Sequence, residues 1–244
     1  MSGLSPPLGS PAPGPRASRV RTFHARRGRR SALTEHRLAT LLPQYATPAT
    51  VFTPPGTPGR PERVVLEVGC GHGAAALGYA AAYPSHHVVA TDVHPPGIAR
   101  MLAAGVAEGI GVDRLSARLG DAVELLEQLP EGVLDVVHVF FPDPWPKARH
   151  ARRRLLSGPT LGLLASRLTP GGEVLLATDQ PEYAAWVAEQ VAEAVGSGWV
   201  LEPAQRPRWR PVAGYEAKGV AAGRPPIERR LTVERDDVVP ASIA

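Results

Sequence analysis

Residues 140–147, Phe-Phe-Pro-Asp-Pro-Trp-Pro-Lys, combine three kinds of side chain that could act together on a nucleobase. They include one carboxylate (Asp143), one flat aromatic ring (Trp145) and one ammonium group (Lys147). Three prolines within five residues exclude a helix and a central strand, so the segment is predicted to be a stiff loop. The basic side chains that follow directly are Arg149, His150, Arg152, Arg153 and Arg154.

Each of these side chains also has a plainer structural interpretation. Asp143 stands between two prolines and could simply hold a turn. Trp145 could pack the loop against the protein instead of stacking on a base, and we favour this packing role. A single arginine could be solvated, but a whole basic cluster at 149–154 beside this loop favours contact with RNA.

Acidic residues also stand where three successive strands are expected to end. Glu67 lies just before the glycines Gly69 and Gly71, Asp92 ends the next strand, and Asp121 follows the third. Glycines let the backbone turn tightly and let a ligand approach closely. Carboxylates at these points suit S-adenosylmethionine, which carries an ammonium and a sulfonium. Asp92 would bind the ribose hydroxyls, and Asp121 would bind the adenine amino group.

Other interpretations of this region stay open. The spacing of residues 69–74 also fits the turn that binds dinucleotides, although Glu67 would repel a pyrophosphate there. Asp92 or Asp121 taken singly fits a helix N-cap equally well. Glu67 itself could be a solvated strand end.

The chain from Arg63 onward alternates strand-like and helix-like segments. Strands are predicted at 63–68, 87–92, 114–119, 134–140, 173–178, 199–202 and 228–234. Helices are predicted at 74–82, 96–108, 122–128, 160–168 and 181–195. This alternation predicts an α/β fold with a mostly parallel, seven-stranded sheet and helices on both faces. In such sheets ligands bind beyond the carboxyl ends of the strands, where these acids are expected.

The N-terminal part of the chain differs in composition from this body. Composition divides the chain into a disordered tail at 1–18, a basic arm with a short helix at 19–46, a proline-rich linker at 47–61, the α/β domain at 62–235 and a tail at 236–244. Residues 1–37 hold eight arginines against one acid, which gives a local charge of +7. Such a concentrated charge suits a polyanion as partner.

Cysteine content and hydropathy indicate in which cellular compartment the protein is expected. The single cysteine, Cys70, rules out an internal disulfide framework and suits the reducing cytoplasm. The sequence has no apolar run of membrane length and no signal-peptide pattern, so we expect no membrane association. Cys70 and His72 lack partners at metal-ligand spacing, so no metal site is expected. The oligomeric state does not follow from the sequence.

Taken together, these motifs resemble those of the bacterial tRNA (guanine-N7-)-methyltransferases over roughly residues 19–234. Most of the resemblance lies in 141–155, Phe-Pro-Asp-Pro-Trp-Pro-Lys-Ala-Arg-His-Ala-Arg-Arg-Arg-Leu. Further matches are Asp92-Val-His-Pro-Pro-Gly97, Thr178-Asp179-x-x-x-Tyr183, Tyr215-Glu216-x-Lys218-Gly219-x-x-x-Gly223 and Arg21-Thr-Phe-x-x-Arg26-x-Gly28-Arg29. The resemblance implies a Rossmann-like class I methyltransferase domain, S-adenosylmethionine as cofactor and tRNA as partner. It also implies methylation of a guanine in the variable loop, position 46.

The same resemblance implies roles for individual residues. Glu67, Asp92, Asp121 and Asp143 would contact S-adenosylmethionine, and Asp143 would also be the catalytic residue. Substrate contacts would come from Lys147, Asp179, Ala213, Gly214, Tyr215 and Glu216. The residues facing RNA would be Arg149, Arg152, Arg153 and Arg154. The family usually has threonine where Ala213 stands, so that hydroxyl contact is absent or replaced.

The chemistry of guanine N7 narrows the role of the acids. N7 carries a lone pair and no proton, so positioning matters and no general base is obligatory. A carboxylate, Asp143 with Asp179 as a second candidate, would stabilise the positive charge that develops on the base. Asp179 could instead cap a helix. N7 faces the deep groove of A-form RNA, so the guanine must be displaced and could stack on Trp145 or Tyr215.

Three other functions fit parts of the sequence. A class I methyltransferase could act on another RNA or on a small molecule, although a small-molecule enzyme has little use for a strongly basic arm. A nicotinamide-dependent oxidoreductase could use the glycine-rich turn, but Glu67 argues against it. An RNA-binding protein with an inactive methyltransferase fold would not need acids at three strand ends.

Overall fold

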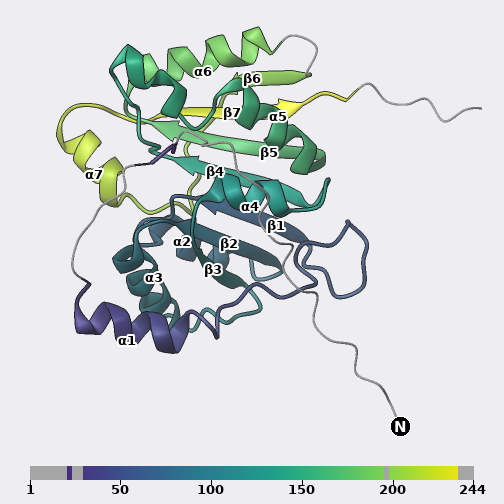
Figure 1. Ribbon diagram of the computed structural model, residues 1–244, viewed down its shortest axis with the longest axis vertical. Helices are drawn as coiled ribbons and strands as arrows, with labels where there is room; N and C mark the ends of the chain where they lie inside the picture. Colours follow the sequence, from purple (N-terminus) through teal and green to yellow (C-terminus); the bar gives the residue numbers. More distant parts are fainter. Residues whose placement is uncertain (1–20, 24–29, 195–197, 236–244) are drawn as a thin grey trace, which may run out of the picture.

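The computed structural model describes residues 21–23, 30–194 and 198–235. These residues form a seven-stranded sheet in the order β3-β2-β1-β4-β5-β7-β6 (Figure 1). Strands β1 to β5 run parallel to one another, and β7 runs antiparallel to both β5 and β6. The predicted α/β class, with a mostly parallel Rossmann-like sheet, is confirmed. The predicted tails at 1–18 and 236–244, and residues 19–20 and 24–29 of the basic arm, lie outside the described residues.

The strand boundaries agree closely with the sequence pattern. The strands are β1 (Arg63–Val68), β2 (His86–Asp92), β3 (Leu115–Leu119), β4 (Leu134–Phe140), β5 (Leu168–Thr178), β6 (Trp199–Pro203) and β7 (Ile227–Val233). Central strands such as β1 are mostly apolar and buried because helices cover both of their faces. Only β5 differs clearly from the prediction, since it begins at Leu168 and passes through a Pro-Gly-Gly sequence typical of a turn.

Helices cover both faces of the sheet. They are α1 (Ala32–Leu41), α2 (Ala74–Ala82), α3 (Pro95–Ala107), α4 (Ala122–Gln128), α5 (Gly158–Arg167), α6 (Pro181–Glu193), α7 (Gly214–Ala221) and the 3-10 helix η1 (Ala148–Arg153). One apolar core joins the sheet to α2 and α3, with α1 packed outside α3, and a second joins it to α4, α5 and α6 (Figure 1). The sequence pattern missed α7 and η1, because α7 is short and contains two glycines and η1 follows a proline-rich loop.

The segment before β1 is packed onto the domain. The Tyr45 hydroxyl donates to the carbonyl oxygen of Ile110 at 2.8 Å. Val51 is buried in the core, and the guanidinium of Arg60 forms a buried ion pair with Asp135 at 2.6 Å. Residues 47–61, predicted to be a linker, are therefore fixed to the domain at both of these points and do not form a free tether.

Candidate active site

The four acids predicted to bind the cofactor lie along one edge of the sheet. Glu67 is near the end of β1, Asp92 ends β2, Asp121 follows β3, and Asp143 follows β4. These four strands are neighbours in the sheet, so acids that are far apart in the sequence meet at one edge. This is the edge at which parallel α/β sheets bind their ligands.

The glycine-rich turn leaves room at this edge. Gly69 and Gly71 have φ values of 72° and 57°, a backbone conformation that favours glycine. A Cβ atom built at either position would meet no atom within 4 Å, so the space in front of the turn is open. The Gly71 N–H donates to Asp92 at 2.7 Å, and the His94 N–H donates to the other carboxylate oxygen, also at 2.7 Å. Asp92 therefore ties the turn to the end of β2.

Asp121 is the N-cap of α4. Its side chain accepts a hydrogen bond from the Val123 N–H at 3.0 Å, so the capping interpretation is correct for this residue. The preceding Gly120 N–H donates to the Asp92 carbonyl oxygen at 3.0 Å, which holds the ends of β2 and β3 together. A carboxylate has about four acceptor sites, so a capping bond is compatible with a contact to a ligand.

Glu67 is buried beside a histidine. It is 3% exposed, and its Oε2 lies 3.5 Å from Nδ1 of His138, which is 0% exposed. The imidazole ring packs against Phe140, Tyr79 and Trp209, with centroid separations of 4.9, 5.1 and 5.0 Å. Glu67 is therefore not a solvated strand end. His138 was not among the predicted site residues, because only the β1–β4 register brings it opposite Glu67.

The loop after β4 holds Asp143 in a strained and well-anchored backbone. Phe141 and Trp145 have φ values of 52° and 42°, which are unusual for residues other than glycine. Each such conformation costs about 1–3 kcal/mol and persists only where the surroundings enforce it. The Arg154 guanidinium donates to the carbonyl oxygens of Pro144 and Trp145 at 3.0 and 3.3 Å. Asp143 is half-buried between these points.

Trp145 packs the loop instead of presenting a face to a base. Its side chain is 4% exposed, and the Arg153 guanidinium lies 3.6 Å from the ring centroid. Its indole N–H donates to the carbonyl oxygen of Thr22 at 3.2 Å. The packing interpretation is therefore correct. Tyr215, which is 61% exposed at the start of α7, is the remaining candidate for stacking on a base.

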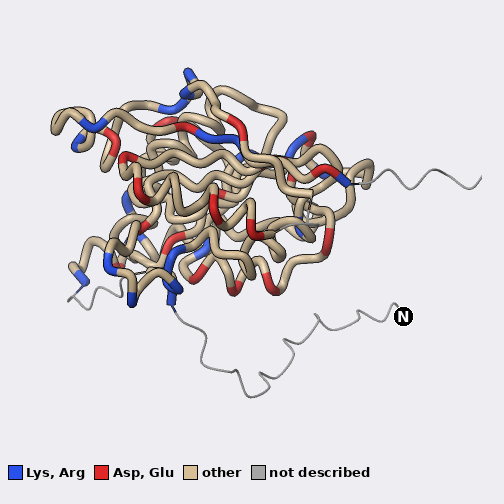
Figure 2. The backbone as a smooth tube through the Cα atoms, turned by 90° about the horizontal axis from the view of Figure 1, so that it is seen from above, with Lys and Arg blue, Asp and Glu red and all other residues tan. Residues whose placement is uncertain are grey.

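The basic cluster divides into two pairs. Arg149 and Arg152 are exposed, as is Lys147 before them. Arg153 and Arg154 are half-buried, and their guanidinium groups bind carbonyl oxygens of the protein itself. Figure 2 shows Lys and Arg gathered beside the point where the described chain begins. Only the first pair has the geometry expected of arginines that face RNA.

Within the segment 213–216, Gly214 and Tyr215 are exposed but Glu216 is buried. Ala213 is the N-cap of α7 but makes no side-chain capping bond, as expected where threonine is missing. Gly214 has a φ of 55°, which directs the chain into the helix. Glu216 is 3% exposed, and its carboxylate accepts hydrogen bonds from Arg206 and Arg210. In this structure Glu216 anchors α7.

A buried ionic network extends from Glu216 to the end of β4, just before the loop that holds Asp143. The Arg210 guanidinium bonds to Glu216 and to Glu228 of β7, and it lies 4.6 Å from the ring centroid of Phe140. Burial alone would raise the pKa of Glu216, but hydrogen bonds from Arg206 and Arg210 outweigh it and lower the pKa. The network therefore connects α7, β7 and the end of β4.

Asp179 follows β5 and is paired with an arginine. Its Oδ2 accepts from Nε of Arg224 at 3.0 Å, and its Oδ1 accepts from Gln180 at 3.0 Å. Burial raises the pKa of Asp179, but these hydrogen bonds outweigh it, so the pKa lies below its usual value. The N-cap of α6 is Gln180, so the capping interpretation of Asp179 is wrong.

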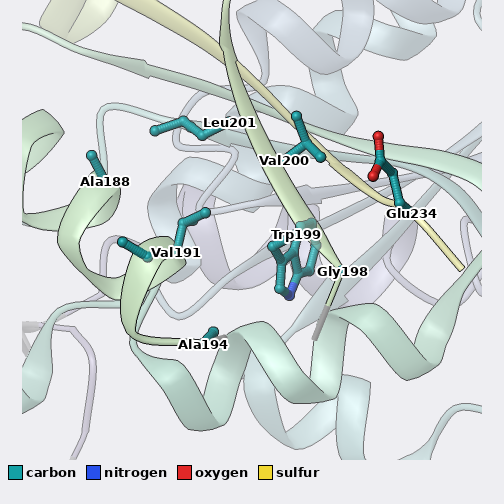
Figure 3. A pocket seen from close by; sticks show the side chains of 9 residues that line it. Ala188, Val191, Ala194, Gly198, Trp199, Val200, Leu201 and Glu234 are labelled. Carbon is teal, nitrogen blue, oxygen red and sulfur yellow. The ribbon is translucent and has the colours of Figure 1, made fainter. Parts of the chain in front are cut away.

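The described residues offer little elsewhere that could do chemistry. They contain no group of three or more His, Cys, Asp or Glu placed to hold a metal ion. No helix among them is long and apolar enough to cross a bilayer. Figure 3 shows a pocket between α6 and the start of β6, walled by apolar side chains such as Val191, Trp199 and Leu201. It lies at the opposite edge of the sheet from the strand-end acids.

Sequence comparison decides the family. A family profile described as "Putative methyltransferase" matches residues 61–228. The chain is 38% identical over 213 residues to a tRNA (guanine-N(7)-)-methyltransferase of Methylococcus capsulatus, covering 84% of this chain and 90% of that protein. The chain belongs to the tRNA (guanine-N7-)-methyltransferase family. A second member, from Ralstonia nicotianae, is 39% identical over 216 residues, covering 84% of this chain and 83% of its own length. The family resemblance carried by residues 141–155 is thus confirmed.

Solved structures support the fold of the family. A putative rRNA methylase from Clostridium thermocellum aligns with a TM-score of 0.51 and 14% identity, covering 71% of this chain and 88% of its own. A precorrin-6y C5,15-methyltransferase from Geobacter metallireducens aligns with a TM-score of 0.50 and 13% identity, covering 70% and 80%. At such low identity these similarities establish the class I methyltransferase fold and say nothing about the substrate.

Proposed function

We propose that this protein transfers the methyl group of S-adenosylmethionine to N7 of a guanine in tRNA, and that this guanine is position 46 of the variable loop. One observation carries the proposal: Asp143 lies on an anchored loop at the end of β4, in line with Glu67, Asp92 and Asp121 at neighbouring strand ends. The proposed activity implies a cytoplasmic location.

The strand-end residues fit S-adenosylmethionine as a ligand. The open space before Gly69 and Gly71 lets a ligand approach the backbone closely, and the carboxylates beside it suit a cationic molecule. At the ends of β2 and β3, Asp92 would bind the ribose hydroxyl groups and Asp121 the adenine amino group. When bound, S-adenosylmethionine supplies a methyl group attached to a positively charged sulfur.

Asp143 is assigned to the guanine. Because N7 has no proton to lose, the carboxylate would orient the base through its N–H groups and stabilise the positive charge that the base gains. Asp179, whose carboxylate binds Arg224 and Gln180, is the second candidate for this role. Tyr215 would stack on the displaced base, a contact worth about 1–3 kcal/mol.

The exposed cations are assigned to the phosphates of the tRNA. Lys147, Arg149 and Arg152 lie beside the loop that carries Asp143, and all three are exposed. Each phosphate that they neutralise would steepen the dependence of log affinity on log salt by about one unit. This positive surface suits a polyanionic substrate better than a small molecule.

The test is methyl transfer from labelled S-adenosylmethionine to three samples: bulk tRNA from cells that lack the modification, ribosomal RNA and a reaction without RNA. Label should enter tRNA alone, and Asp143→Asn should abolish most of it. Label in ribosomal RNA but not in tRNA would show that the enzyme acts on another RNA. Absence of S-adenosylmethionine binding would reject the methyltransferase assignment.

A further inference from the structure

Three consecutive carbonyl oxygens at the start of the described chain are bound by two side chains of the 140–154 region. Arg153 donates from Nε to Arg21 and from Nη2 to Phe23, each at 3.0 Å. Trp145 donates from its indole N–H to Thr22 at 3.2 Å. The two side chains thus bind one short piece of backbone from a part of the sequence more than 120 residues away.

The donors are themselves held in place. The Arg153 guanidinium lies 3.6 Å from the centroid of the Trp145 ring. In this geometry the face of the aromatic ring attracts the cation. Trp145 is buried, and its left-handed backbone is fixed by hydrogen bonds from Arg154 to the loop. The stacking and the Arg154 bonds do not involve residues 21–23, so they restrict the two donors independently of that segment and reduce the entropy cost of binding it.

The acceptors are backbone groups, so this contact requires no particular side chain at residues 21–23. The side chain of Arg21 stays exposed while its carbonyl oxygen is bound. The contact therefore fixes the chain at the catalytic loop and leaves the Arg21 cation at the surface. Arg153, by contrast, uses two of the five N–H donors of its guanidinium in hydrogen bonds to the protein itself.

We propose that Trp145 and Arg153 form a clip that fixes residues 21–23 on the loop carrying Asp143. Arg153 is a positioning residue for this loop and for the basic arm, and Arg21, not Arg153, is the phosphate contact at this place. The role in methylation rests on the proposed function, but the clip itself is a property of the protein without RNA or cofactor.

Trypsin provides a direct probe, because the carbonyl bound by Arg153 belongs to the peptide bond that trypsin cleaves after Arg21. Cleavage of that bond in the full-length protein is followed by mass spectrometry, in the absence of RNA. Arg153→Ala and Arg153→Lys are compared with Arg152→Ala, which removes the same charge from the neighbouring exposed position. Trp145→Phe removes the indole donor and part of the ring on which Arg153 stacks, but keeps an aromatic face. Thermal unfolding identifies any variant that fails to fold.

The clip predicts that Arg153→Ala and Arg153→Lys are both cleaved after Arg21 at least about tenfold faster, because the loss of charge-assisted bonds opens the segment. Lysine keeps the charge but lacks the planar fork that spans two carbonyls. Trp145→Phe should give a smaller increase, and Arg152→Ala none. The clip would be overturned if Arg153→Lys were cleaved after Arg21 at the wild-type rate, or if Arg152→Ala accelerated this cleavage as much as Arg153→Ala does.

Two functional measurements then separate positioning from phosphate binding. The positioning role predicts that Arg153→Lys lowers kcat for tRNA about tenfold, as expected when a loop near the chemistry is displaced, while the salt dependence of tRNA binding is unchanged. Arg21→Ala should lower that salt slope by about one unit. An unchanged kcat in Arg153→Lys would overturn the positioning role. Absence of tRNA methylation by the wild-type protein would instead reject the proposed function and leave the protease result standing.

Discussion

The carboxylate of Glu67 and the imidazole of His138 face each other across β1 and β4, 3.5 Å apart and both almost completely buried. A buried carboxylate is costly unless a partner compensates the loss of water. His138 Nε2 has no hydrogen-bond partner among the described residues, so Glu67 is the polar partner that the structure gives this ring. His138 therefore sets the position of the acid nearest to the glycine-rich turn.

Replacing His138 tests this relationship. His138→Leu removes the partner of Glu67 and should weaken S-adenosylmethionine binding about tenfold, because a buried carboxylate left without a partner loses roughly 1–3 kcal/mol. His138→Gln keeps an N–H donor and should recover most of the affinity. Titration calorimetry measures both. Equal affinities for the leucine, glutamine and wild-type proteins would show that His138 only fills space.

The network around Glu216 should contribute to stability. Glu216→Gln removes one charge from a buried cluster, so we expect a loss of about 3 kcal/mol in the free energy of unfolding. Glu202 provides a matched control, since its ion pair with Arg230 is about half exposed, with exposures of 47% and 50%. Glu202→Gln should cost less than about 1 kcal/mol. Urea unfolding compares the two, and similar losses would contradict the buried role of Glu216.

The same network predicts a pH dependence. The folded-state pKa of Glu216 lies below its ordinary value of 4.5. Its contribution to stability is therefore present above that ordinary value and is lost as the pH falls through the lowered folded-state pKa. Wild-type stability should fall more steeply than that of Glu216→Gln as the pH is lowered below 4.5. Parallel curves in urea unfolding over this range would contradict the prediction.

Gly97 in α3 should be essential for the shape of the cofactor turn. A Cβ atom there would overlap the carbonyl oxygen of Gly71, which is backbone and cannot move without displacing the turn. Gly97→Ala should therefore weaken S-adenosylmethionine binding at least about tenfold, or more than 1.4 kcal/mol. Gly162→Ala is the control, because its added Cβ meets no atom within 4 Å. That variant should be neutral or more stable by up to about 1 kcal/mol.

Tyr215 should act on the substrate and not on the fold. Its ring is 61% exposed, so Tyr215→Ala should leave the unfolding temperature within about 2 °C of the wild type. Loss of stacking should lower kcat/KM for tRNA about 5- to 100-fold, and Tyr215→Phe should restore it. A full loss in the phenylalanine variant would show that the hydroxyl group, and not the ring, makes the contact.

Much of the fold follows from local patterns in the sequence. Apolar runs that end in Gly, Asp or Pro mark the strands, and the acids at their ends could be placed on one edge because parallel strands align their carboxyl ends. The start of β5 could not be predicted, since Thr169-Pro-Gly-Gly172 looks like a turn, and only the pairing of Leu168 with Leu134 of β4 places the start of the strand before it.

The parts of the site that sequence reasoning missed depend on long-range register or on backbone acceptors. His138 meets Glu67 only through strand pairing across 71 residues. The arginines that bind Glu216 come from an irregular segment without a periodic pattern. The sequence places Arg153 in a basic cluster that predicts contact with RNA. Its actual partners, the carbonyl oxygens of Arg21 and Phe23, are backbone groups and leave no signature in the sequence.

The most direct test of the proposed function is the position of the transferred methyl group in a defined tRNA. A transcript with guanine at position 46 and a control with adenine there are methylated with labelled S-adenosylmethionine, and chain cleavage at 7-methylguanine locates the product. We predict N7 methylation of guanine 46 only, no product with the adenine control, and a single-turnover rate about 100-fold lower for Asp143→Asn. Methylation of another atom or another nucleotide, or an unchanged rate in Asp143→Asn, would contradict it.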